Sequence, residues 1–116
     1  MENLLTLEPF RRGLDLFNRR EFFECHEVWE DLWRPSRGPE RLFLQALIHF
    51  AVGFYHHQRS NPQGAARQLR KGLRKLAGYL PEFEGIETAL LYREGQDCLQ
   101  QIISGLPLAD YPRIEC

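Results

Sequence analysis

The apolar residues of the chain recur at the three- to four-residue spacing of amphipathic helices, and no stretch shows the alternation of a strand. The pattern predicts five helices, at about residues 8–18, 21–33, 39–59, 61–79 and 86–104, and an irregular tail over 105–116. Asn61 followed by Pro62 is typical of a helix start. Because the connections are short, neighbouring helices are expected to be antiparallel. The sequence therefore predicts an all-α, compact antiparallel bundle in a single domain, residues 1–116.

The third predicted helix is apolar on nearly every side, which is typical of the buried centre of a bundle. The first four helices also form two helix–turn–helix pairs, and Leu69, Leu73 and Leu76 suit a tetratricopeptide pattern. The period of about 34 residues is not kept, however. A tetratricopeptide-like peptide-binding module is therefore only an alternative.

Composition and charge narrow the class of protein. The formal net charge is −1, so neither nucleic acid nor an anionic membrane is expected as a partner. Cys25, Cys98 and Cys116 form no C-x-x-C pair, which argues against zinc and thiol redox motifs. The start lacks a secretory signal, and the longest apolar stretch, 42–55, is too short to span a bilayer. We expect a reduced, cytoplasmic protein.

The segment Phe22–Trp33 holds the first half of a candidate site. On a helical wheel His26 falls within the apolar face that also carries Trp29, whereas Glu30 lies one turn later at the margin, where its carboxylate can accept the imidazole N–H. Two interpretations stay open: a core histidine that joins two helices, favoured from this helix alone, or a ligand or general base oriented by Glu30.

The third helix holds the second half. Gln45, His49 and His56 stand within a narrow arc of the wheel, and His57 lies off this line and is expected to face solvent. Where the two helices meet, the candidate cluster is His26, Glu30, Gln45, His49 and His56, with Glu27, Trp29, Tyr55 and Asn61 as secondary positions.

The chemistry of this cluster has competing interpretations. His26, Glu30, His49 and His56 are candidate ligands for a divalent transition metal, the one cofactor suggested. The segment fails as an H-E-x-x-H zinc site because Glu30 occupies the position of the second histidine. A structural polar network is favoured, and a metal or small-ligand site is the alternative.

The fourth predicted helix presents a basic face with no acidic residue among its members, which are Arg67, Arg70, Lys71, Arg74 and Lys75. A solvated face is the favoured interpretation. The alternatives are docking against the acidic outer face of the second helix, within the chain or across a homo-oligomer, and contact with a phosphate backbone. The net charge and the lack of a recognition motif argue against nucleic acid.

No complete catalytic signature is present. The chain lacks a glycine-rich phosphate loop and a G-x-S-x-G elbow. Cys25 and His26 are adjacent, but consecutive helical residues point about 100° apart, which argues against a thiolate–imidazole pair. We therefore favour a non-enzymatic helical domain with an interaction or structural role.

Several segments together resemble the DUF309 family, a domain of unknown function found in bacteria and archaea. The resemblance is carried by Phe22-Phe23-Glu24-x-His26-Glu27-x-Trp29-Glu30, Leu44-Gln45-x-Leu47-Ile48, Ala51, Tyr55-His56 and Asn61-x-x-Gly64-Ala65. Arg20 departs from the family pattern, which has a turn glycine there. The resemblance implies a compact all-α domain and no particular activity.

Overall fold

The chain folds into five α-helices packed side by side, as the computed structural model of residues 3–116 shows. The helices are α1 (Glu8–Asn18), α2 (Phe22–Trp33), α3 (Pro39–Gln58), α4 (Pro62–Leu76) and α5 (Thr88–Ile103), with short 3-10 turns η1 (Leu4–Thr6) and η2 (Ala77–Tyr79). In the described residues, β-structure is limited to one bridge between Phe83 and Ile86. The predicted all-α fold is confirmed.

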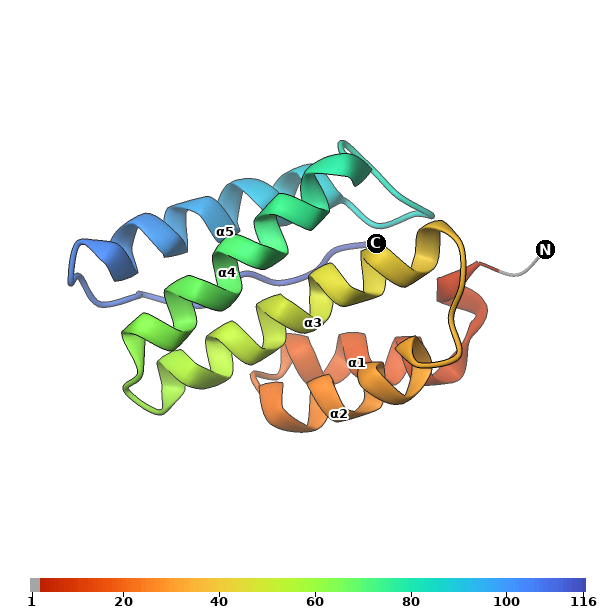
Figure 1. The fold of residues 1–116 in the computed structure, drawn as a ribbon, viewed down its shortest axis with the longest axis horizontal. Helices are drawn as coiled ribbons and strands as arrows, with labels where there is room; N and C mark the ends of the chain where they lie inside the picture. Colours follow the sequence, from red (N-terminus) through yellow and green to blue (C-terminus); the bar gives the residue numbers. More distant parts are fainter. Residues whose placement is uncertain (1–2) are drawn as a thin grey trace.

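Helix α3 lies in the middle of the bundle, with α1 and α2 on one side and α4 and α5 on the other (Figure 1). The rings of Phe43, Phe50 and Phe54 are fully buried, which confirms α3 as the buried central helix. Gly72 lets α4 approach closely, because a Cβ there would lie 3.1 Å from the carbonyl oxygen of Ala46. Because α3 and α4 lie so close together here, the α3 side chains beside Gly72, such as His49, face α4.

The helix ends have local causes. Asn61 caps α4, since its Oδ1 accepts a hydrogen bond of 3.0 Å from the Gly64 N–H. The first turn of α5 begins at Thr88, two residues later than the sequence pattern suggests. Ile86 is buried and pairs with Phe83 across a tight turn that contains Gly85 at φ +87°. Helix α5 therefore begins only after this turn.

The C-terminal tail has no regular secondary structure, yet it is packed onto the bundle, along which it runs back (Figure 1). Ile114 is buried, and its N–H and C=O bond to the side-chain amide of Asn18 at 2.8 and 3.1 Å. The Tyr111 ring contacts Phe22 and Phe54, each with centroids 5.2 Å apart. Tail and helices therefore share one core.

The turn between α1 and α2 passes through Arg20, whose φ of 69° lies in the left-handed region that favours glycine. The guanidinium of Arg20 donates to the Asn18 and Tyr111 carbonyl oxygens and lies 2.6 Å from Asp110. The turn thus keeps a glycine-like conformation, and the arginine side chain ties it to the tail. In residues 3–116, no helix has the combination of length and hydropathy that a membrane crossing requires.

Candidate functional site

The outer sides of α2, α3 and α4 form one surface, here called the three-helix face. Helix α3 packs against both α2 and α4, so its exposed stripe lies between them. That stripe follows helical spacing and carries an exposed leucine and half-buried polar and apolar side chains, namely Leu42, Gln45, His49, Val52 and His56. Most of the residues singled out from the sequence lie on this face or beside it.

His49 is held between two residues of α4. Its Nδ1 lies 2.8 Å from Oε1 of Gln68, and its Nε2 lies 2.6 Å from Nζ of Lys75. An amide oxygen can only accept and an ammonium can only donate, so the two contacts require a neutral ring protonated on Nδ1. Desolvation lowers the pKa of His49, and the positive charges of Lys75 and Lys71 lower it further. His49 is therefore a hydrogen-bonded link between α3 and α4.

His26 lies on the α2 side of the three-helix face. Its Nδ1 lies 2.6 Å from the carbonyl oxygen of Phe23, one turn earlier in the same helix. Glu30, the partner suggested by the sequence, instead lies 3.5 Å from the guanidinium of Arg34. The Phe23 ring contacts both the His26 ring, at 5.0 Å, and the Tyr55 ring of α3, at 5.2 Å. The Nδ1 of His26 therefore has a hydrogen-bond partner in the backbone of its own helix and does not need a carboxylate.

The structure does not join the five cluster residues by hydrogen bonds to one another. Among residues 3–116, no three His, Cys, Asp or Glu side chains are placed so that they could hold one metal ion. His56 lies at the other end of the α3–α4 contact, where a Cβ on Gly64 would be 3.1 Å from its ring. Gln45 is half-buried. The His26 Nδ1 contact lies within α2, whereas His49 joins α3 to α4, so the predicted cluster is not one polar network.

Two of the secondary positions, Trp29 and Asn61, make hydrogen bonds to the backbone of the helices. Trp29 is fully buried, and its Nε1–H donates to the carbonyl oxygen of Phe10 at 3.3 Å. Tyr55 is half-buried, with Arg59 over its ring at 5.6 Å. Glu27 is exposed.

Cys25 is buried and its S–H donates to the Gly13 carbonyl; burial raises the pKa of this thiol and keeps it protonated.

Opposite charges border the two sides of the three-helix face. On α2, three glutamates form what we call the acidic edge: Glu24, Glu27 and Glu30. On α4, three cations form the basic edge: Arg67, Lys71 and Lys75. In residues 3–116, the ion pairs include none of the five basic side chains that the sequence groups on this helix. Docking of this basic face onto α2 within the chain is thus not observed in the described residues.

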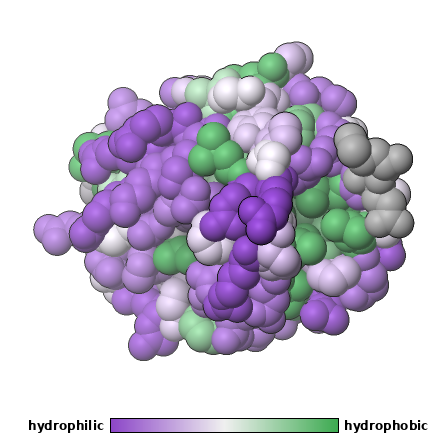
Figure 2. Space-filling model, turned by 45° about the vertical axis from the view of Figure 1, so that its right-hand side comes forward, coloured by the Kyte–Doolittle hydropathy of each residue, from purple (hydrophilic) through white to green (hydrophobic). Residues whose placement is uncertain are grey.

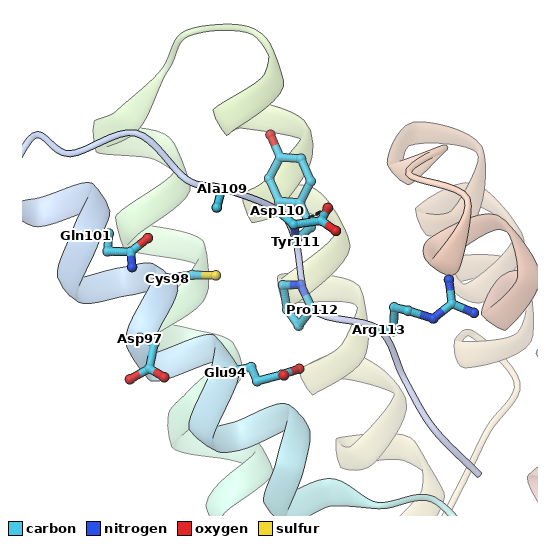
Figure 3. A pocket seen from close by; sticks show the side chains of 9 residues that line it. All are labelled: Glu94, Asp97, Cys98, Gln101, Ala109, Asp110, Tyr111, Pro112 and Arg113. Atoms are coloured by element: carbon cyan, nitrogen blue, oxygen red, sulfur yellow. Dashed lines mark hydrogen bonds between the residues drawn. The ribbon is translucent and has the colours of Figure 1, made fainter.

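A second candidate site is a pocket of about 320 Å³ between α5 and the tail (Figure 3). Three acidic residues and one arginine are among the residues that line it, which are Glu94, Asp97, Cys98, Gln101, Ala109, Asp110, Tyr111, Pro112 and Arg113. The Cys98 sulfur points from α5 toward the tail, whereas the Asp97 carboxylate points away (Figure 3). Burial, followed by the nearby carboxylates, raises the pKa of Cys98 to about 11. The thiol is therefore protonated near neutral pH and is a poor nucleophile.

The tail contacts were not anticipated from the sequence. His57, expected to face solvent, is half-buried and its Nδ1 lies 2.7 Å from the hydroxyl of Tyr111, so that expectation is wrong. The three apolar residues Tyr111, Pro112 and Ile114 of the tail were a weak signal for packing, since they follow no helical period. The pocket exists only because this segment returns to α5.

Comparison with known proteins shows which family this chain resembles. The model of a family described as "Domain of unknown function (DUF309)" matches residues 10–68, which contain most of α1, all of α2 and α3, and the first half of α4. The "Uncharacterized protein YpuF" of Bacillus subtilis (strain 168) is 39% identical over 59 residues, which cover 49% of this chain and 33% of that protein. An "Uncharacterized protein" of Aquifex aeolicus (strain VF5) is 22% identical over 100 residues, covering 85% of this chain and 29% of that protein. The chain thus matches about a third of the length of these relatives.

Proposed function

The chain belongs to the DUF309 family, which confirms the resemblance seen in its sequence, and we propose that it is a non-enzymatic helical interaction domain whose three-helix face binds another protein. The observation that carries the proposal is the basic edge. Three cations of one helix side lie together without an ion pair in residues 3–116, beside a stripe that contains the exposed Leu42. Uncompensated charge on a folded surface favours a partner of opposite charge.

The character of the surface supports a polar contact rather than a purely apolar one. Figure 2 shows a view in which hydrophilic side chains predominate and hydrophobic ones form separate patches. Phe23 and Leu42 are 42% and 44% exposed and lie on α2 and α3. Interfaces between proteins that also exist alone combine a few buried apolar anchors with a polar rim. The three-helix face has both components.

The state of the reactive groups supports a non-enzymatic role. The buried thiols of Cys25 and Cys98 have raised pKa values, and both ring nitrogens of His49 are occupied by α4 side chains. A metal-dependent function has less support, because the four candidate ligands are not grouped in the described part of the chain. His49 instead links α3 to α4 through Gln68 and Lys75.

Photocrosslinking in the source cells tests the proposal. Benzoylphenylalanine replaces Leu42 on the three-helix face or, as a matched control, the exposed Arg93 on α5. We expect protein adducts from position 42 that are lost when Arg67→Glu and Lys71→Glu are added, with few adducts from position 93. Adducts that arise equally from both positions, or that persist after the charge reversal, would contradict the proposal. Mass spectrometry identifies the partner.

A further inference from the structure

We propose that the partner of the three-helix face is a second copy of the chain, placed about a two-fold axis that runs parallel to α3 between the two copies. This inference rests on the proposed function and names the partner for the same surface. It makes α2 of each copy lie over α4 of the other. The dimer would then be isologous, the commonest symmetry of soluble homo-oligomers.

The first argument is charge complementarity. The acidic edge lies on α2 and the basic edge on α4, α3 lies between them, and no ion pair joins them in residues 3–116. Of the acidic edge only Glu30 is paired in the described part of the chain, with the neighbouring Arg34. With a net charge of −1, the chain as a whole offers no bulk attraction to a polyanion. An acidic surface of similar length is present on α2 of the same chain.

The second argument is symmetry. A rotation of 180° about an axis parallel to α3 exchanges the two sides of the face, so the acidic edge of one copy meets the basic edge of the other, twice. An axis across α3 would instead place acidic edge on acidic edge and basic on basic, and like charges facing each other are strongly unfavourable. Of the two simple face-to-face arrangements, only the first is attractive.

The third argument is register along the axis. Helices α2 and α4 both run antiparallel to α3, because Phe23 contacts Tyr55 and Gly64 lies beside His56 at the C-terminal end of α3. A rotation about an axis parallel to α3 keeps every residue at its height. Acidic residues at 24, 27 and 30 and basic residues at 67, 71 and 75 both recur once per helical turn, over about 9 and 12 Å. The two charged edges therefore coincide along their length.

The middle of the interface would be the α3 stripe of both copies, with Leu42 and Phe23 as apolar anchors. A standard interface takes about 800 Å² from each partner, which is about one eighth of the 6403 Å² accessible surface of this chain. A contact of this size is thus of ordinary dimensions.

A charge swap tests the proposal. Sedimentation velocity across the micromolar range is run on the wild type, on Arg67→Glu/Lys71→Glu and on Glu27→Lys/Glu30→Lys. We expect a dimer for the wild type that weakens as salt rises. Each reversed variant should dimerise at least about tenfold more weakly, because like charges then face each other twice. An equimolar mixture of the two variants should form a heterodimer, since both contacts become attractive again.

A matched reversal elsewhere controls for general effects of charge. Arg12→Glu/Arg93→Glu changes α1 and α5 by the same amount and should leave the dimer unchanged, and circular dichroism should show that all variants fold. A monomeric wild type, a dimer indifferent to the reversals, or a failure of the mixture to associate overturns the inference. If the chain is monomeric while crosslinks from position 42 reach a different protein, the partner is not a second copy of the chain. The proposed function then still stands.

Discussion

Nζ of Lys75 lies 2.6 Å from Nε2 of His49, so an ammonium on α4 donates to an imidazole on α3. The arrangement requires His49 to stay neutral, because a proton on Nε2 would point at the ammonium. Burial, then the nearby cations Lys71 and Arg74, lower the pKa of Lys75, just as burial and the lysines lower the pKa of His49. The link between the two helices is therefore sensitive to acid.

Acid should loosen the bundle through His49. The ring has a lowered pKa when folded, so between that value and the ordinary 6.5 the unfolded chain binds more protons, and the free energy of unfolding falls as pH drops below about 6.5. One group contributes at most about 1.4 kcal/mol per pH unit. Urea unfolding against pH should show a smaller slope for His49→Gln than for the wild type. His57, whose pKa burial also lowers, supplies a remaining slope of the same sign. Equal slopes of unfolding free energy against pH in both proteins would show that His49 does not cause the loss of stability in acid.

Packing at the α1–α2 crossing should not tolerate a methyl group at position 13. A Cβ on Gly13 would overlap the indole of Trp29, whose ring stacks on Phe10 and Phe17. Forcing extra volume into a well-packed core costs about 1–3 kcal/mol or more. Gly13→Ala should therefore lower the thermal midpoint by several degrees and disturb the tryptophan fluorescence. Gly78→Ala is the matched control, since a Cβ there meets nothing within 4 Å. Similar midpoints for the two variants would show that Trp29 can move aside.

The tail should detach when Asn18 is shortened. The Asn18 amide makes both of its hydrogen bonds to the backbone of Ile114, at 2.8 and 3.1 Å. Asn18→Ala leaves the N–H and C=O of a buried residue without these partners, which costs about 1–3 kcal/mol. Hydrogen exchange should become faster over residues 110–115, while the α3–α4 amides stay protected. Gln96→Ala, on the exposed side of α5, is the control, and unchanged exchange in the tail would place its anchor elsewhere.

Helical periodicity was enough to predict the fold class because it records which side of each helix is buried. The apolar surface of α3 predicted its central position, and the Asn61–Pro62 pair predicted the start of α4. These are local features, and their cause lies within a few residues of sequence. The later start of α5 depends on the bridge between Phe83 and Ile86, which follows from burial of Ile86 and leaves no local periodic signal.

The contacts of the candidate residues were harder to predict because they join distant segments. The wheel placed His49 on the right stripe, but its partners Gln68 and Lys75 depend on how closely α4 approaches. His57 and Tyr111 are 54 residues apart, and only the path of the tail brings them together. Arg20 departs from the glycine of the family pattern, and its side chain bonds to a tail that the sequence pattern left irregular.

Purified chain should carry no stoichiometric transition metal. A metal needs a free ring nitrogen, and at His49 one nitrogen faces Gln68 and the other faces Lys75, whose positive charge also repels a cation. The His26 Nδ1 faces the Phe23 carbonyl, which leaves only its Nε2 for a metal, and no group of three ligand side chains occurs in residues 3–116 to complete a site. Elemental analysis of protein prepared without a nickel column measures this directly, with a dialysed sample incubated with zinc as the second arm. Metal bound one to one and lost in His26→Ala would mean that the side chains of α2 and α3 rearrange around an ion. The polar residues of the three-helix face would then be ligands rather than links between helices.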